Sequence, residues 1–94
     1  MTFKIKFTNS AAKDLLAIKK YIYEDNELAA KKVVAHIIKQ IETILPQMPN
    51  AGRAGRVLRT RELIILKYPY IVPYQIKDNN IYILRVLHTS KKWE

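Results

Sequence analysis

Apolar and polar residues alternate at the start of the chain, where residues 3–7 read Phe-Lys-Ile-Lys-Phe. A period of two places every second side chain on the same face, so the pattern predicts a strand with one buried face. The apolar spacing then changes to three and four, at Ala11, Leu15, Ile18 and Ile22. This spacing predicts an amphipathic helix over residues 10–24, and the Asn9-Ser10 pair can supply its N-cap.

A second helical pattern covers residues 27–45, after Glu24-Asp25-Asn26 interrupts the first. Its apolar side holds Ala30, Val33, Val34, Ile37, Ile38, Ile41, Ile44 and Leu45. Two helices joined by so short a connection must pack as an antiparallel hairpin. Pro46 and Pro49 are expected to end the second helix, because proline lacks the backbone N–H that a helix interior requires.

Three apolar segments in the second half of the chain predict strands, over residues 62–66, 70–76 and 81–87. The third segment is the most apolar and is expected inside the sheet, with both of its faces covered. Pro73 falls within the second segment, where it cannot donate to a ladder, so we expect it at an edge or a bulge. A loop over residues 46–60 holds both glycines of the chain, Gly52 and Gly55.

This order of elements predicts a single α+β domain over residues 1–94. The sheet is expected to be small, twisted and mostly antiparallel, with about four strands in the order β-α-α-β-β-β. The helical hairpin should cover one face. The other face is expected to stay partly open and would then be the natural binding surface.

Charge changes this picture because it is unevenly distributed along the chain. The net charge is +9, of which residues 1–48 contribute +3 and residues 49–94 contribute +6. All five arginines lie in the second half: Arg53, Arg56, Arg59, Arg61 and Arg85. Arginine presents a planar fork that matches phosphate or carboxylate. The second half therefore predicts a recognition surface for nucleic acid or for an acidic protein segment.

Several classes of protein are excluded by what the chain lacks. It has no cysteine, which excludes disulfide scaffolds and thiolate metal sites, and its two histidines are too few for a metal cluster. We therefore expect no metal and no cofactor. There is no run of about 18 apolar residues, so no membrane-spanning helix is expected. The first residues lack the apolar block of a signal peptide, and the expected location is the cytoplasm.

The stretch from Gly52 to Leu63 holds four arginines and no acidic residue before Glu62. Glycines let a backbone turn tightly and approach a ligand, and arginines can add forked hydrogen bonds to phosphate or carboxylate. The alternative is a loop whose arginines are simply solvated. The glycine spacing differs from that of a phosphate-binding P-loop.

Arg61, Arg85 and His88 are the candidate chemical groups of the strands. Arg85 must pair with an anion or emerge on the open face, and Glu62 is a candidate partner for Arg85 or for a loop arginine. His88 could act as a general acid or base beside arginines that hold a phosphate. The favoured interpretation is a structural histidine satisfied by a backbone carbonyl. Three tyrosines could stack on bases, although core packing is expected for at least two of them: Tyr70, Tyr74 and Tyr82.

Three blocks of sequence stand in an order that is similar to one known family. They are the Pro49–Arg56 loop, the Thr60-Arg61-Glu62-Leu63 strand start, and the strand pair Pro69–Tyr74 and Ile83–His88. These blocks resemble the Pro…Gly-Arg loop, the Thr-Arg-Glu-Leu start and the Tyr-x-Val-x-Tyr and Arg-Val-Leu-His strands of the RelE/ParE toxin superfamily. The resemblance spans nearly the whole chain and implies a toxin of a type II toxin–antitoxin module.

The resemblance implies one fold with two activities. RelE-like members are ribosome-dependent mRNA endonucleases, whereas ParE-like members inhibit DNA gyrase without chemistry of their own. The ParE-like branch is favoured, because no tyrosine follows the last strand and no Lys-x-Lys pair occurs over residues 46–60. In the nuclease alternative, Arg61 and Arg85 would clamp a phosphate and His88 would be the acid or base. A third alternative is a remnant of this fold that only binds an antitoxin.

The resemblance also implies the partners. They are an acidic, largely disordered antitoxin that carries a DNA-binding domain, and either gyrase or the ribosome with its mRNA. Operator DNA would be reached only through the antitoxin, and no membrane is involved. The expected contact residues for target and antitoxin are Arg53, Arg56, Arg59, Arg61, Arg85, His88, Lys91, Lys92 and Trp93.

Overall fold

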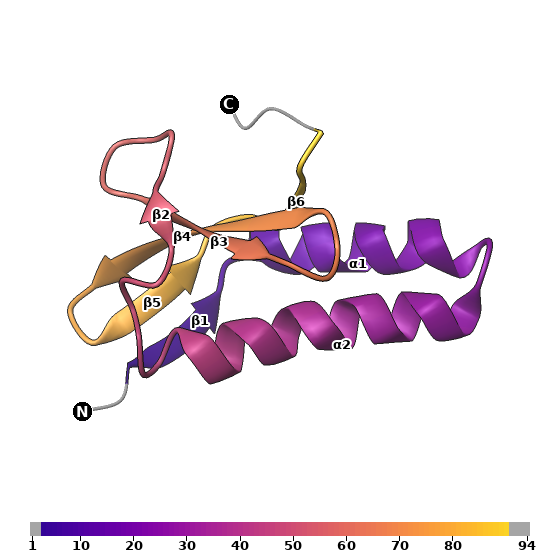
Figure 1. Ribbon diagram of the computed structural model, residues 1–94, viewed down its shortest axis with the longest axis horizontal. Helices are drawn as coiled ribbons and strands as arrows, with labels where there is room; N and C mark the ends of the chain where they lie inside the picture. The colour runs from indigo at the N-terminus through magenta and orange to yellow at the C-terminus, as the bar shows by residue number, and fades with distance from the viewer. Residues whose placement is uncertain (1–2, 91–94) are drawn as a thin grey trace.

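Two antiparallel helices pack on one face of a mixed β-sheet in the computed structural model, which describes residues 3–90 (Figure 1). The elements follow the predicted order: β1 (Lys4–Phe7), α1 (Asn9–Tyr23), α2 (Glu27–Ile44), β2 (Arg53–Ala54), β3 (Arg61–Ile65), β4 (Tyr70–Lys77), β5 (Asn80–Ile83) and β6 (Leu87–His88). The α+β class and the helical hairpin are confirmed. Within the described residues the sheet has six strands rather than about four.

The helices begin at side chains that accept hydrogen bonds from free backbone N–H groups. Asn26 caps α2 by accepting from the N–H of Ala29, at 3.0 Å. The cap of α1 is Thr8, not the predicted Asn9-Ser10 pair, because the chain is still extended at Thr8 and already helical at Asn9. The hydroxyl of Thr8 accepts from the N–H of Ala11 and also contacts the carbonyl oxygen of Ile83, at 2.8 Å. This one residue therefore starts α1 and attaches it to β5.

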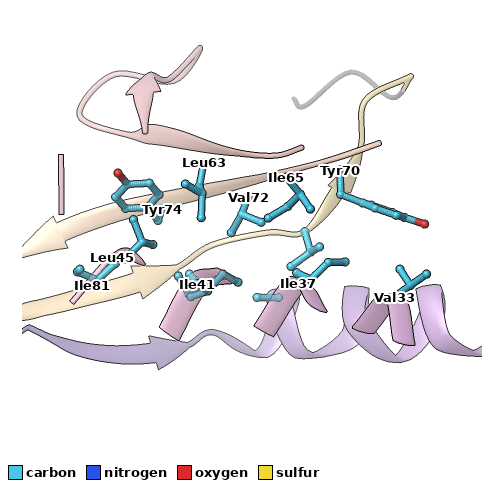
Figure 2. Close-up of a cluster of buried hydrophobic side chains, with 13 residues drawn as sticks. Val33, Ile37, Ile41, Leu45, Leu63, Ile65, Tyr70, Val72, Tyr74 and Ile81 are labelled. Carbon is cyan, nitrogen blue, oxygen red and sulfur yellow. The ribbon is translucent and has the colours of Figure 1, made fainter. Parts of the chain in front are cut away.

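The core lies between α2 and the sheet (Figure 2). Val33, Ile37 and Ile41 recur on successive turns of α2, Leu45 follows at its C-cap, and all four face the side chains of β3, β4 and β5. The sheet contributes alternate residues to the same cluster: Leu63, Ile65, Tyr70, Val72, Tyr74, Ile81 and Ile83. The apolar spacing that predicts α2 is therefore the spacing that buries it.

The sheet is open, and it brings the first strand of the chain beside a strand near its other end. Its strand order is β1-β5-β4-β3-β2, with β6 paired to β4. The β2–β3, β3–β4, β4–β5 and β4–β6 pairs are antiparallel, whereas β1 runs parallel to β5, with Ile5 opposite Ile81. The first strand thus depends on the fifth for its partner.

Pro73 interrupts the strand that was predicted over residues 81–87. Ile83 pairs with Tyr74 and Leu87 pairs with Ile71, so three residues on one strand oppose two on β4. The carbonyl oxygen of Pro73 accepts from the N–H of Leu84, but proline offers no N–H in return. The predicted strand is therefore wrong for residues 84–86, which form a link between β5 and β6. The predicted bulge is confirmed, although β4 lies inside the sheet and not at its edge.

The sheet face opposite the helices is partly open, as predicted, but its middle is buried. Residues that alternate with the core positions point to this face, yet Glu62 and Ile71 are 1% and 2% exposed. The loop after β2 rises on this side of the sheet, and Figure 1 shows it standing away from α2. Ile64 of β3 is 43% exposed on this face, and Lys4 and Lys6 of β1, which alternate with core-facing residues, are exposed there too. The loop over residues 46–60, called the arginine loop below, thus covers part of the surface that was expected to bind a partner.

Candidate functional site

The arginine loop is held by one buried carboxylate. Oε1 of Glu62 accepts from Nε and Nη2 of Arg53, at 3.3 and 3.1 Å. Oε2 accepts from the backbone N–H of Arg56 at 3.3 Å, and Nε of Arg56 lies 3.8 Å away. The expected pairing of Glu62 with a loop arginine is confirmed, and its pairing with Arg85 is wrong. Arg53 and Arg56 therefore fix the conformation of this loop through Glu62, in addition to giving it positive charge.

Arg61 also supports the loop. Its Nε donates to the carbonyl oxygen of Gly52 at 2.9 Å, and its Nη2 donates to that of Asn50 at 3.2 Å. From β4, the hydroxyl of Tyr74 donates to the carbonyl of Pro49 at 2.7 Å and accepts from the N–H of Gly52. A Cβ at Gly52 would lie 2.7 Å from the Tyr74 ring, which explains the glycine. Two N–H donors of the Arg61 guanidinium are therefore already hydrogen-bonded to backbone carbonyls.

The exposed tip of the loop carries Arg59. Its φ of 67° is in the left-handed region, which is unusual for a residue other than glycine. Two exposed apolar side chains, Val57 and Leu58, precede it. Arg59 is the loop arginine whose guanidinium makes neither a hydrogen bond nor an ion pair with the described residues, which leaves it available to a partner.

Arg85 pairs with Asp14 of α1. Nε and Nη2 of Arg85 donate to the two carboxylate oxygens at 2.7 and 3.0 Å, and the N–H of Val86 donates to the same carboxylate at 2.9 Å. The hydrogen bond that Arg85 donates to Asp14 raises the pKa of Arg85 above its ordinary value, against a smaller opposing effect of burial. Of the two roles open to Arg85, the structure shows the internal pairing, with a partner 71 residues away that the sequence did not identify.

His88 is oriented by a serine and not by the expected backbone carbonyl. Its Nδ1 accepts from the N–H of Ser90 at 3.1 Å and lies 2.7 Å from the Ser90 hydroxyl. A nitrogen that accepts carries no proton, so the neutral ring is protonated at Nε2. The ring also meets Tyr70 edge-on, with centroids 5.4 Å apart. His88 therefore presents a donor, Nε2–H, away from its serine.

Arg85 and His88 meet at a pocket between α1 and β6. The pocket has a volume of about 570 Å³ and is lined by Asp14, Ala17, Ile18, Tyr21, Tyr70, Arg85, Val86, Leu87, His88 and Ser90. Tyr70 reaches it from the end of the core, and Figure 2 shows its hydroxyl pointing away from the other core residues. Burial, and secondarily the charge of Tyr21, raise the pKa of Tyr70. Arg61 does not line this pocket, so the three candidate nuclease residues do not form one cluster.

The remaining expectations are distributed as follows. Tyr70 and Tyr74 are core residues, which confirms that at least two of the three tyrosines pack internally, and Tyr82 is half-buried. Lys91, Lys92 and Trp93 lie outside the described residues. Within residues 3–90, no three carboxylate or imidazole side chains gather where they could hold a metal ion. In the same range, no helix is both long and apolar enough to cross a membrane.

Comparison with known proteins places this geometry in a family. The sequence profile of the ParE toxin of type II toxin–antitoxin system parDE matches residues 5–93. The Y4kP protein of Sinorhizobium fredii, which is named as a toxin, is 39% identical over 90 residues, 96% of this chain and 92% of that protein. Toxin RelE2 of Caulobacter vibrioides is 30% identical over 88 residues, 94% of this chain and 97% of that protein.

A solved structure carries the same likeness in three dimensions. A chain of the chromosomal ParDE toxin–antitoxin system from P. aeruginosa superposes with a TM-score of 0.86 at 32% identity. The match covers 93% of this chain and 96% of that one. Sequence profile, sequence relatives and fold therefore agree along nearly the whole length.

Proposed function

The chain belongs to the ParE toxin family of type II toxin–antitoxin systems, and on this basis we propose that it blocks DNA gyrase and is neutralised by an acidic antitoxin. Its place in a toxin–antitoxin system makes an antitoxin its partner. The gyrase target is the proposal. It extends to this chain an activity of the ParE-like branch that the loop and the last strands resemble.

The observation that carries the proposal is the internal use of the arginines. A nuclease that acts through a phosphate clamp needs guanidinium groups that are free to bind the scissile phosphate. Here Arg61 donates to two loop carbonyls and Arg85 donates twice to Asp14. Releasing either group would break hydrogen bonds that hold the fold. A toxin that acts by binding needs no such clamp.

One observation favours the nuclease alternative. Arg85 and His88 line the same pocket, and the Nε2–H of His88 is free to donate to a ligand. Asp14 already accepts hydrogen bonds from two donors of Arg85. Arg85 is also the one arginine among the described residues that line the pocket, so Arg85 and His88 would have to act without a second guanidinium. The experiment that tests the gyrase proposal therefore also measures mRNA cleavage.

The test runs two assays on the same purified protein. Supercoiling by gyrase is measured as toxin is added, and in vitro translation is followed by primer extension on the mRNA. We expect supercoiling to be lost near stoichiometric toxin while the message stays intact. Cuts in phase with codons, absent in His88→Ala, would replace the gyrase proposal with the ribonuclease. Tight antitoxin binding without either activity would identify a non-toxic remnant of the fold.

A further inference from the structure

The pocket between α1 and β6 has an apolar centre with aromatic walls. Ala17 and Ile18 of α1 line it together with Val86 of the link between β5 and β6. Two tyrosines, Tyr21 and Tyr70, complete the walls, and Tyr21 is 76% exposed although it lies beside this cavity. A volume of about 570 Å³ is within the range of pockets that receive a drug-sized group, so it can hold one large side chain. An apolar cavity of this kind favours an occupant that is itself apolar.

The polar groups of the pocket favour a carboxylate-bearing peptide over a phosphate. Arg85 is neutralised by Asp14, which also lines the cavity and would repel a doubly charged phosphate. The groups left to donate are the Nε2–H of His88, the remaining guanidinium N–H groups and the hydroxyls of Tyr21 and Tyr70. Such donors suit single hydrogen bonds to carbonyl or carboxylate oxygens. The cavity thus resembles a protein interface more than a nucleotide site.

Positive charge that makes no ion pair within residues 3–90 lies beside the cavity and not within it. Lys13 and Lys20 are exposed, and they stand four residues before and three residues after the pocket residue Ala17. On a helix these spacings place the two ammonium groups along the rim that Ala17 occupies. A partner that inserts an apolar side chain would therefore carry acidic residues next to it. The net charge of +9 adds long-range attraction for such a segment.

We propose that this pocket anchors the antitoxin by receiving one large apolar or aromatic side chain from an acidic segment, with the flanking carboxylates on Lys13 and Lys20. The proposal rests on the toxin–antitoxin part of the proposed function and is independent of the gyrase target. The Asp14–Arg85 pair is then the floor of the pocket, and Tyr21 is the wall that closes over the inserted side chain.

Binding is tested on the whole purified chain with a synthetic probe. The probe is a capped acidic peptide with one central phenylalanine, added while amide signals are followed by nuclear magnetic resonance. We expect saturable shifts at Ala17, Ile18, Tyr21, Leu87 and His88. A peptide with alanine in place of phenylalanine, and one with glutamines in place of the acids, should each bind at least fivefold more weakly. Equal binding of all three peptides would overturn the proposal.

Two pairs of variants separate the pocket from the general basic surface. Tyr21→Ala should weaken the binding of the acidic peptide by about two- to tenfold, since an aromatic pair contributes about 0.5–1.5 kcal/mol beyond area burial. Tyr23→Ala, an exposed tyrosine of the same helix that does not line the pocket, is the control and should change binding less than twofold. His88→Ala should also weaken binding, whereas His36→Ala, which removes a similar edge-on contact with Tyr68, should not.

Other occupants give different results in the same titration. Inorganic phosphate or a dinucleotide that produces these shifts more strongly than the peptide would identify a nucleotide site and overturn the proposal. Shifts that depend on protein concentration alone, with a dimer in sedimentation, would identify a second copy of this chain as the occupant. Because every readout is binding to the toxin, failure here leaves the supercoiling result untouched, and failure of the gyrase proposal leaves this one untouched.

Discussion

The Asp14–Arg85 ion pair provides the sharpest test of how this fold is held together. Asp14→Asn, Arg85→Met and the double variant form a thermodynamic cycle that isolates the interaction of the two side chains. The pair attaches the first turns of α1 to the link between β5 and β6. If it stabilises that attachment, each single variant loses the interaction and the second substitution costs less than the first.

The expected magnitude follows from geometry and burial. Two charge-assisted hydrogen bonds of 2.7 and 3.0 Å form a bidentate pair, and hydrogen bonds to charged groups contribute about 1.5–3 kcal/mol. Fully exposed pairs give about 0.2–1 kcal/mol. Since the Asp14 and Arg85 side chains are 17% and 36% exposed, the coupling energy should lie in the lower part of the first range, at about 1.5–2 kcal/mol.

Urea unfolding followed by circular dichroism measures the four free energies of the cycle. In thermal unfolding, a loss of about 2 kcal/mol should lower Tm by about 8–16 °C for a domain of this size. Asp25→Asn, in the exposed turn between the helices, is the control and should stay within about 0.5 kcal/mol of the parent chain. A coupling energy below about 0.5 kcal/mol would refute the reasoning, because the pair would then behave as a solvated surface contact.

Two further predictions concern buried ionisable groups. Glu62→Gln keeps the shape of the side chain but removes the charge that holds Arg53 and Arg56, so stability should fall by about 1.5–3 kcal/mol and the Arg56 amide should exchange faster; unchanged exchange would contradict this role. Tyr70 has a pKa raised above 10.0 by burial and, less strongly, by Tyr21, so the folded state holds its proton more tightly than the unfolded chain does. The resulting contribution is present below pH 10 and is lost as pH rises through the folded-state pKa, and Tyr70→Phe should flatten this alkaline fall in urea unfolding.

The helices could be predicted closely because their signal is local. Apolar spacing along α2 selects the residues that are buried, and a cap such as Asn26 acts within three residues of itself. The cap of α1 was missed because Thr8 also bonds to β5, a contact that local pattern does not contain. Strand interruptions have the same origin. The apolar run over residues 81–87 is continuous in sequence, and only the position of Pro73 on the neighbouring strand breaks it.

The candidate site was predicted by residue type, and among the partners only the pairing of Glu62 with a loop arginine was predicted. The arginines were predicted as contact residues from their type and position, but the groups that they pair with decide whether they can bind a ligand. Arg85 pairs with Asp14, which lies 71 residues earlier in the chain, and Arg61 donates to carbonyl oxygens of a loop whose path depends on Tyr74. No spacing rule relates such pairs. The pocket beside α1 escaped the sequence for the same reason, since its walls come from three separate segments.

The parallel pairing of β1 with β5 has a consequence for how the toxin is made. Thr8, directly after β1, bonds to a carbonyl 75 residues later, so the first strand has no partner until most of the chain has been synthesised. At about 5–20 residues per second, the N-terminal strand waits about 4–15 s on the ribosome. Contacts this distant along the chain also slow folding after release. There is therefore an interval in which the chain is complete but its sheet is not yet formed, during which an antitoxin already present can meet it.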